Sequence, residues 1–320
     1  METIGVILIT FNGEKFIIEQ LKSILNQSVQ PNEVLIFDDN SQDNTLNLIL
    51  QFINNNNLQN WKVYKNNNNL GWIQNCLKAL DTCKTDIIFW SDQDDIWYPE
   101  KIQKMVYAKQ KFNCHIVYSS WDYIDSNGKS MNLFTGERTG KLIKIDPYNK
   151  STKTPPLLGC SSCFSKQLSN ILISLASGDF NSPDWLMYRL GISLNSVIFV
   201  DSPLFSRRIH ENNVTSSKKT LYRTWFFSFK KHKKMISVLR CQKNMLSKII
   251  CDINKLDILA DTSYIQLEFD FLKKRIEFLE DGKHMCSYIK TSFRINSFSD
   301  FINSFLKDVL FVICRSFSYL

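Results

Sequence analysis

The segment Ile87-Ile88-Phe89-Trp90-Ser91-Asp92-Gln93-Asp94-Asp95-Ile96-Trp97 joins an apolar run to three carboxylates within four positions. Such a run predicts a strand buried on both faces, and open α/β folds bind ligands where these strands end. Mg²⁺ and Mn²⁺ prefer oxygen ligands, typically one or two carboxylates together with substrate phosphates. The D-x-D spacing of Asp92 and Asp94 therefore predicts a divalent metal that binds a diphosphate. The alternative is a solvated acidic turn that caps a helix starting near Pro99.

Upstream of this segment, strand and helix patterns alternate four times. Apolar runs at residues 4–9, 34–37, 61–64 and 87–90 predict strands, and apolar residues at helical spacing separate them. This alternation predicts an α/β fold with a doubly wound, mostly parallel sheet. The loops at the carboxyl ends of its strands should form one ligand crevice.

A second strand also ends in acids, at Asp38-Asp39-Asn40-Ser41. Acids at this position of dinucleotide-binding folds accept hydrogen bonds from a nucleotide, which predicts a nucleotide contact here. The alternative is a helix start, in which Asn40 or Ser41 acts as the N-cap.

After Trp97 the pattern predicts a helix over 99–112, a strand over 116–119, a further helix containing Leu168 and a last strand over 197–200. Residues 136–156 read as a long polar loop. Because long loops in compact domains are usually functional or mobile, this one is a candidate lid over the crevice.

Two further motifs follow in this part of the chain. Asp184, between Pro183 and Trp185, is either a general base or an acid stabilised by a helix N-terminus. The segment from Arg207 to Asn213 is expected to be a loop after a strand. It is either a solvated polar loop by which the chain leaves the body, or it supplies Arg and His side chains that hold a diphosphate leaving group.

The charge is unevenly distributed. The net charge is +8, but no acid occurs between Asn212 and Cys251, where ten lysines and arginines lie between Lys218 and Lys248. This predicts a body of residues 1–217 and a basic appendage of residues 218–320 whose partner is anionic. The nine cysteines lack paired metal-ligand spacing, which indicates reduced thiols in the cytoplasm.

The appendage carries apolar residues at helical spacing between its lysines, among them Trp225, Phe226 and Leu239. They predict either a helix lying in the interface of an anionic membrane or a helical hairpin folded on the body. Residues 301–320 are a second candidate membrane contact, interrupted by Asp308 and Arg315. No apolar stretch is long enough to span a bilayer, and nothing in the body indicates a nucleic-acid partner.

Taken in order, these segments resemble the family 2 glycosyltransferases with the GT-A fold. The resemblance rests on residues 6–13, 38–43, 69–71 and 91–97. Residues 183–185, 201–204 and 208–214 resemble the rhamnosyltransferase-type branch that builds bacterial surface polysaccharides such as O-antigen and capsule. Pro183 and Leu186 depart from that branch, which often has a histidine and a second tryptophan at these positions.

The resemblance implies a role for each matched residue. Nucleotide-sugar contacts would come from Thr10, Asn12, Asp38 or Asp39, Gly71, Asp92, Arg208 and His210, and the metal would bind Asp94 and Asp92. Asp184 would be the catalytic base, so that the sugar is transferred with inversion, and Gly159, Cys160 and Trp185 would lie on the acceptor side.

The function expected is a metal-dependent, inverting glycosyltransferase at the cytoplasmic face of the cell membrane. It would use a nucleotide-diphosphate sugar, with rhamnose as a candidate sugar, and a lipid-linked saccharide acceptor. One alternative is a sugar nucleotidyltransferase, although the N-terminal segment Thr10-Phe11-Asn12-Gly13-Glu14 lacks the phosphate loop of those enzymes. Another is a non-catalytic membrane-bound scaffold on a transferase fold.

Overall fold

In the computed structural model the chain forms two compact units. One unit comprises residues 1–145 and 154–216, and the other comprises 146–153 and 217–320. The described residues are 2–133, 138–149, 157–176, 182–211, 229–255, 262–281, 285–295 and 308. The expected contacts of Trp225 and Phe226, and nearly all of segment 301–320, lie outside them.

The first half of the sheet has the predicted alternation of strand and helix. Its strands run in the order β3-β2-β1-β4, and all three pairings are parallel. The elements are β1 (Ile4–Thr10), α1 (Ile17–Leu25), β2 (Glu33–Asp38), α2 (Thr45–Asn55), β3 (Trp61–Lys65), α3 (Trp72–Thr82) and β4 (Ile87–Ser91).

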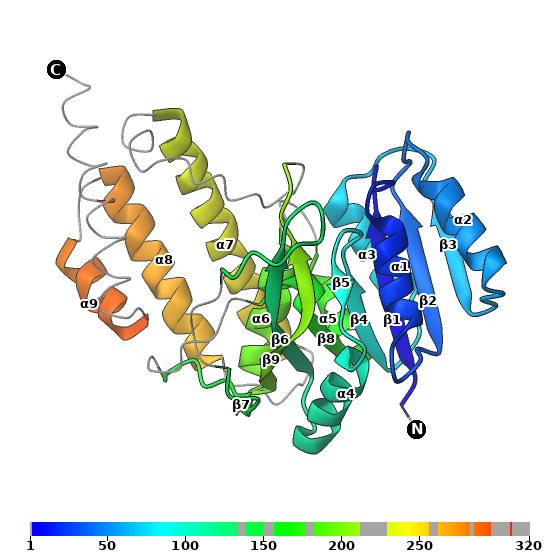
Figure 1. The fold of residues 1–320 in the computed structure, drawn as a ribbon. Helices are drawn as coiled ribbons and strands as arrows, with labels where there is room; N and C mark the ends of the chain where they lie inside the picture. The colour runs from blue at the N-terminus through cyan, green and yellow to red at the C-terminus, as the bar shows by residue number, and fades with distance from the viewer. Residues whose placement is uncertain are drawn as a thin grey trace. The chain divides into compact units, whose positions relative to one another are not determined.

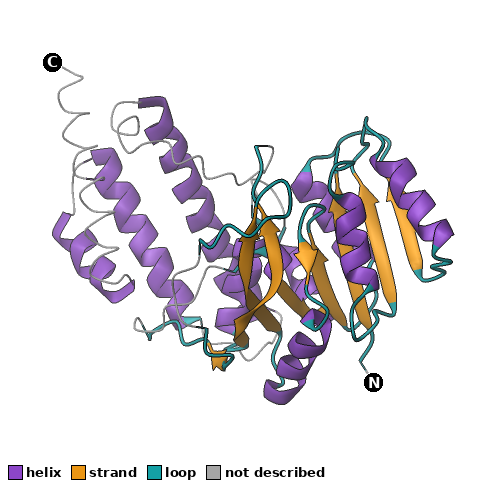
Figure 2. Cartoon of the chain, viewed as in Figure 1, coloured by secondary structure: helices purple, strands orange, loops and turns teal. Residues whose placement is uncertain are grey.

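Helices cover both faces of this sheet (Figures 1 and 2). Right-handed crossovers place α1 and α2 on one face, where they contact each other, and α3 on the other, where it contacts α5. Residues of β1, β2 and β4 are almost all buried, as expected for strands covered on both sides. The predicted α/β class with a mostly parallel central sheet is confirmed.

Beyond β4 the same sheet becomes mixed. Its order continues β8-β6-β9-β5, with β8 antiparallel to both neighbours and β5 antiparallel to β9. The elements are β5 (Ile96–Trp97), α4 (Lys101–Phe112), β6 (Ile116–Ile124), β7 (Leu142–Lys144), the 3₁₀ turn η1 (Gly159–Ser161), β8 (Ser162–Ser165), α5 (Lys166–Leu175), α6 (Pro183–Ser193) and β9 (Val197–Arg208).

Strand β9 differs most from the expectation, because it continues to Arg208 rather than ending at Val200. It pairs in parallel with β6 through irregularities near Ser119 and Ser120, which accommodate Pro203. The predicted loop at Arg207 and Arg208 is therefore wrong for these two residues, which are the last of β9.

The segment expected to be a lid is partly held to the body. Within it, β7 pairs with β9, and Thr139 donates to Asp201 Oδ2 from its N–H at 2.9 Å and from its hydroxyl at 2.6 Å. Arg138 also forms an ion pair with Asp122 at 2.6 Å. Residues 138–145 thus contain the edge strand β7 and the residues leading to it, and both are bonded to the body. Residues 150–156 lie outside the described residues.

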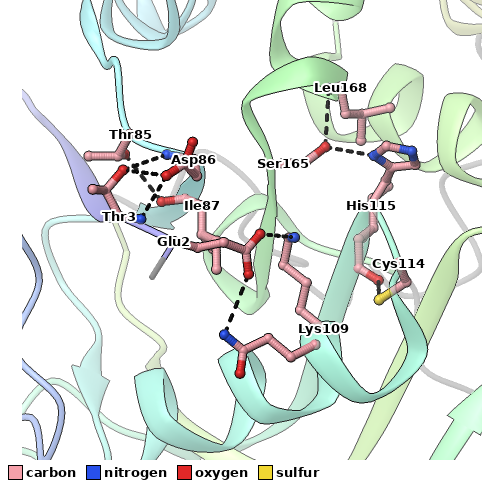
Figure 3. A network of polar contacts seen from close by, with 12 residues as sticks. Glu2, Thr3, Thr85, Asp86, Ile87, Lys109, Cys114, His115, Ser165 and Leu168 are labelled. Carbon is pink, nitrogen blue, oxygen red and sulfur yellow. Dashed lines mark hydrogen bonds and ion pairs between the residues drawn. The ribbon is translucent and has the colours of Figure 1, made fainter.

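A polar network fastens the amino ends of β1 and β4, at the edge opposite the predicted crevice (Figure 3). Thr3 donates to Asp86 Oδ2 from both its N–H and its hydroxyl at 2.8 Å, and these bonds lower the pKa of Asp86. Lys109 of α4 reaches Glu2 at 2.8 Å. This network fixes the strands at the end remote from the candidate site.

Asparagine occupies all the non-glycine positions at which the described backbone has a positive φ. These are Asn12, Asn40, Asn57, Asn113, Asn132 and Asn195, with φ between 44° and 63°. A short polar side chain that bonds locally makes asparagine the most tolerant L-residue in this region.

The second unit consists of α7 (Phe229–Lys255), α8 (Ser263–Asp281) and α9 (Met285–Ile295). Leu239, Leu246 and Ile249 of α7 are buried, and α7 packs against α8. These contacts explain this part of the apolar pattern within the unit, and both the membrane helix and the hairpin folded on the body stay predictions. No helix among the described residues has the length and apolar character that crossing a membrane requires.

Asp308 is a buried part of this helical unit. Its carboxylate accepts from Arg275 Nε at 2.8 Å and Nη2 at 3.1 Å, and from the Tyr288 hydroxyl at 2.7 Å. Only 1% of Asp308 is exposed. The acid that interrupts the apolar C-terminal pattern is thus a buried partner of Arg275, whose side chain is 18% exposed.

Candidate active site

Neighbouring parallel strands end at one edge of the sheet, at residues that the sequence singled out. Thr10 closes β1 opposite Asp38 of β2, and Ser91 closes β4 opposite Leu8 of β1. The loops that follow these strands, residues 11–13, 39–41 and 92–95, therefore meet at the edge where α/β folds bind ligands.

The Asp38 carboxylate is fully buried and joins the end of β1 to the loop of residues 39–41. Its Oδ2 accepts from the Thr10 hydroxyl at 3.0 Å, and its Oδ1 accepts from the N–H of Ser41 at 2.9 Å. Asn12 adds two cross-links, because its N–H donates to Ser41 Oγ and its Oδ1 accepts from the N–H of Gln42, both at 2.9 Å. The ends of β1 and β2 thus form one fixed surface.

Asp39 organises the loop before α3. Its Oδ1 accepts from Asn66 Nδ2 and from the N–H of Leu70, both at 2.8 Å, and its Oδ2 accepts from the N–H of Gly71 at 2.9 Å. Gly71 has φ 80°, which favours glycine at this turn. Asp38 and Asp39 therefore both have protein partners, and each fixes a different loop at the edge.

In the acidic loop, Asp94 contacts His210, which comes from more than a hundred residues further along the chain. His210 Nε2 lies 2.7 Å from Asp94 Oδ2, and the two side chains are 13% and 15% exposed, respectively. The His210 ring packs on Phe16, with the ring centroids 4.8 Å apart. A carboxylate and an imidazole, both common metal ligands, thus converge at the carboxyl edge.

Asp92 lies in a second cluster with Asp95 and Cys160, whose potential ligand atoms are all within 4.8 Å of one another. Burial raises the pKa of Asp92 to about 6, and the charge of Asp94 adds to this effect. Burial also raises the pKa of Asp95 well above its usual value. Confining these acids costs free energy, which a nearby cation would offset.

Lys101 is an internal cation beside this cluster. Its ammonium is fully buried, donates to the carbonyl of Cys160 at 2.7 Å and lies 4.0 Å and 4.4 Å from the ring centroids of Trp97 and Phe205. Burial lowers the pKa of Lys101 to about 8, although the charge of Asp95 acts in the opposite direction. Lys101 thus places a positive charge on the inner side of the acidic loop.

Asp184 is near the amino end of α6, where the helix dipole favours an acid. Its Oδ1 accepts from the Ser182 hydroxyl at 2.6 Å and from the N–H of Trp185 at 2.9 Å. The charge of Asp184 adds to the effect of burial in raising the pKa of Cys76 and of Asp92. Asp184 thus has local partners at the start of α6, and its charge acts on Asp92.

The turn at Gly159 and Cys160 supports the acidic loop. A Cβ on Gly159 would lie 3.1 Å from the Trp90 ring, so a larger residue would require this ring at the end of β4 to shift by a few tenths of an ångström. Cys160 is 3% exposed, and burial raises the pKa of its thiol well above the usual value. These two residues are buried, while Trp185 on α6 is partly exposed.

The two arginines at the end of β9 have different surroundings. Arg208 is fully buried and forms an ion pair with Glu19 at 2.7 Å. Arg207 is partly exposed, and its charge opposes the rise in the pKa of Asp92. The structure therefore brings Arg207, which was not assigned an individual role, close to the acidic cluster.

The residues present fit a hard divalent cation. Three carboxylates crowd one loop, the pKa of Asp92 is raised, and the buried Oδ2 of Asp95 has no hydrogen-bond partner among the described residues. Mg²⁺ and Mn²⁺ bind oxygen ligands, and the clustered carboxylates of this loop supply them.

Sequence reasoning missed Lys101, Gln93 and Glu19. Each is a single polar residue within an otherwise unremarkable helix or loop pattern, and its partners are remote in sequence. Of these three residues, only Gln93 had a feature in the sequence that could have indicated a role, because it lies between two acids of the D-x-D pattern.

Known proteins match most of this chain. In sequence, dTDP-rhamnosyl transferase RfbG of Shigella flexneri is 27% identical over 275 residues, which cover 80% of this chain and 86% of that protein. The UDP-Glc:alpha-D-GlcNAc-diphosphoundecaprenol beta-1,3-glucosyltransferase WfgD of Escherichia coli is 24% identical over 229 residues, covering 69% and 83%.

In structure, S. aureus TarS 1–349 in complex with UDP-GlcNAc matches with a TM-score of 0.60 and 17% identity, covering 90% of this chain and 79% of that one. This likeness confirms the expected GT-A fold. The family model described as "Glycosyl transferase family 2" matches residues 5–172, which is more than half of the chain. The resemblance seen in the sequence is thus confirmed, and the chain belongs to glycosyl transferase family 2.

Proposed function

We propose that this glycosyltransferase requires a divalent metal and transfers a sugar, with inversion, from a nucleotide-diphosphate donor to a lipid-linked saccharide. The observation that carries the proposal is the contact of Asp94 with His210 at 2.7 Å at the carboxyl edge of the sheet, two positions after Asp92. Metal ligands, phosphate-binding groups and a base are the groups that such a transfer needs.

The donor would lie across the ends of β1, β2 and β4. Thr10, Asn12 and the Asp38 and Asp39 loops would contact the nucleoside, with Gly71 allowing close approach of the loop before α3. Support comes from the hydrogen bonds that join these loops into one surface at the carboxyl edge.

Asp92, Asp94 and His210 would hold the metal. A divalent cation bound there neutralises the charge that develops on the departing diphosphate. The raised pKa of Asp92 supports this role, because a bound cation favours the ionised carboxylate.

Asp184 would act as the base. The acceptor hydroxyl oxygen forms a bond to the anomeric carbon while its proton passes to the Asp184 carboxylate. The bond from that carbon to the diphosphate oxygen breaks, and the nucleoside diphosphate leaves with the electron pair. Attack from the side opposite the leaving group inverts the anomeric centre, with Trp185 next to the base on the acceptor side.

The relatives suggest the first substrates to test. RfbG is named as a dTDP-rhamnosyl transferase, so dTDP-rhamnose is the first donor, and UDP-glucose is the second because WfgD is named for it. The diphosphoundecaprenol acceptor in the name of WfgD supports a lipid-linked saccharide as acceptor.

The proposal is tested by incubating the full chain with each donor, Mn²⁺ and a saccharide linked through diphosphate to a polyprenol. We expect an extended saccharide and one nucleoside diphosphate per transfer. Release of pyrophosphate instead would indicate a nucleotidyltransferase, and the absence of turnover with a panel of nucleotide sugars would contradict the proposal.

We also propose that region 218–320 holds the enzyme on an anionic membrane surface at the cytoplasmic face. Support comes from the basic, acid-free stretch of the sequence, whose lysines would each contribute up to about 1 kcal/mol near anionic lipid. Glutamine would replace Lys218, Lys219, Lys230, Lys231, Lys233 and Lys234 in one variant. In the control variant it would replace Lys273, Lys274 and Lys290.

Vesicles containing phosphatidylglycerol should co-sediment with the wild type and the control variant but not with the first variant. If the first variant sediments as well as the wild type, the basic stretch does not bind membrane.

A further inference from the structure

The Arg208 guanidinium is enclosed by acceptors from three separate parts of the fold. Its Nε donates to the carbonyl of Asp94 at 2.9 Å, and its Nη1 donates to the carbonyls of Asp125 and Ser126 at 3.3 Å and 3.4 Å. Its Nη2 donates to Glu19 Oε2 at 2.7 Å. The side chain is 0% exposed. A guanidinium in this position can reach a diphosphate only by giving up these bonds.

The backbone of Arg208 makes a further contact with the acidic loop. Its N–H donates to Asp95 Oδ1 at 3.2 Å, so both the main chain and the side chain of Arg208 hold residues 94 and 95. Asp94 is also the residue whose carboxylate contacts His210, two positions after Arg208. One arginine therefore fixes the backbone from which the proposed metal ligand projects.

Phe16 links the same groups from the other side. The carbon of the Arg208 guanidinium is 4.6 Å from the centroid of the Phe16 ring, and the His210 ring is 4.8 Å from it. Arg208 and His210 thus pack on one aromatic ring, which gives His210 a fixed position relative to the Asp94 carbonyl.

The neighbouring Arg207 is on the opposite face of β9, because side chains alternate along a strand. It is partly exposed and lies at the carboxyl end of β9, directly before Arg208. A guanidinium with this location suits the donor's diphosphate better than one that is fully buried.

We propose that Arg208 is a positioning residue that aims Asp94 and His210 at the metal, and that Arg207 provides the guanidinium on the donor side. This assigns to Arg208 a different role from the diphosphate contact that the family resemblance implies. The inference rests on the proposed function, because it concerns how the metal and the donor are bound.

The test measures the affinity for UDP and for dTDP by calorimetry, in Mn²⁺ and in EDTA, for the full chain and its variants. Arg208→Lys should lose about 10-fold or more of the affinity gained from Mn²⁺, as is typical when a group that orients a metal ligand is changed. Its affinity in EDTA should stay at the wild-type value. Arg207→Lys should lose affinity in both buffers.

Glu19→Gln is a milder variant, because Glu19 is on α1 with 52% of its side chain exposed and touches the site only through Arg208. It should lose part of the Mn²⁺-dependent gain. Adding it to Arg208→Lys should cost less than the sum of the two single changes. The matched control is Glu100→Gln, an exposed acid paired with Lys104, which should change nothing.

A melting curve identifies variants that fail to fold, and Glu19→Gln carries the test if Arg208→Lys is one of them. Equal losses for Arg208→Lys in Mn²⁺ and EDTA, with Glu19→Gln unchanged, would make Arg208 a direct ligand and overturn the inference. Equal wild-type affinity in the two buffers would overturn it together with the metal requirement. A wild type that binds no nucleotide at all would contradict the proposed function itself.

Discussion

The side-chain amide of Gln93 pairs with both backbone polar groups of Phe11. Its Nε2 donates to the Phe11 carbonyl at 3.0 Å, and its Oε1 accepts from the Phe11 N–H at 2.9 Å. The middle residue of the D-x-D pattern thus extends the backbone pairing beyond the end of β1. It couples the acidic loop to the loop that carries Asn12.

Gly13 makes room for this amide, because a Cβ there would lie 2.3 Å from Gln93 Oε1. Gly13→Ala should therefore displace Gln93 and raise the KM for the donor about 10-fold or more, with a smaller effect on kcat. Steady-state kinetics would measure both. In a Gln93→Ala background the clash is gone, so Gly13→Ala should have little further effect. Fully additive losses would show that Gly13 acts independently of Gln93.

Asp94→Asn should abolish most of the metal-dependent affinity for nucleoside diphosphate, because it removes an anionic ligand from the proposed metal site. Turnover should fall with it, since a metal held there would contact the diphosphate in both the ground and transition states. Calorimetry with UDP and dTDP in Mn²⁺ would measure the loss. Wild-type affinity in the variant would remove Asp94 from the metal site.

Asp184→Asn should separate catalysis from donor binding. The amide keeps the shape of the carboxylate but does not accept the proton, so turnover should fall by about 10²- to 10⁴-fold with donor affinity nearly unchanged. Single-turnover kinetics together with a donor binding curve would test this. If turnover stays at the wild-type level, the base lies elsewhere, and Asp122 and Asp179 would be the next acids to change.

The ion pair of Arg275 and Asp308 should matter more for stability than the ion pair of Arg240 and Glu280. Asp308→Asn leaves the partly buried Arg275 without its counter-ion, and breaking a fully buried pair typically costs about 3 to 5 kcal/mol, which is an upper bound here. Arg240 is 59% exposed, so Arg240→Ala should cost about 1 kcal/mol or less. Urea unfolding followed by circular dichroism would measure both. Equal costs would contradict the buried position of Asp308.

Lys101 should impose a pH dependence on stability. Its pKa is lowered by burial from 10.5 to about 8 in the folded chain. Between these values the unfolded chain binds the extra proton, so the free energy of unfolding should rise with pH across this window. Lys101→Met removes the effect. The free energy of unfolding of the wild type should therefore rise relative to that of the variant by a few kcal/mol from pH 8 to 10.5. Parallel pH curves would contradict the shift.

The sequence predicted the parallel half of the sheet well, because continuous apolar runs such as that of β1 can only be buried strands. It could not predict β5 and β8, whose two and four residues carry too little periodicity to be recognised. It also ended β9 too early, because Asp201, Ser202 and Pro203 interrupt the apolar pattern while β6 accommodates them through irregular pairing.

The acids of the candidate site were found because they cluster in sequence at the ends of strands. Glu19 and Lys101 were not found, because their partners Arg208 and Cys160 are remote in sequence. The bond from Arg208 to the Asp94 carbonyl likewise forms only once the chain has folded. Local sequence likewise gives no way to distinguish Arg207 from Arg208. Their different burial depends on strand direction and on the position of α1.

The asparagines at positive φ indicate where the thermal tolerance of this enzyme could be increased. Asn57 and Asn113 follow α2 and α4, away from the carboxyl edge, and glycine at either position would relieve the residual strain of a side chain. Each change is worth up to about 1 kcal/mol, and several together would raise the melting temperature. Asn12 should be kept, because its side chain bonds the Gln42 N–H beside the proposed donor site.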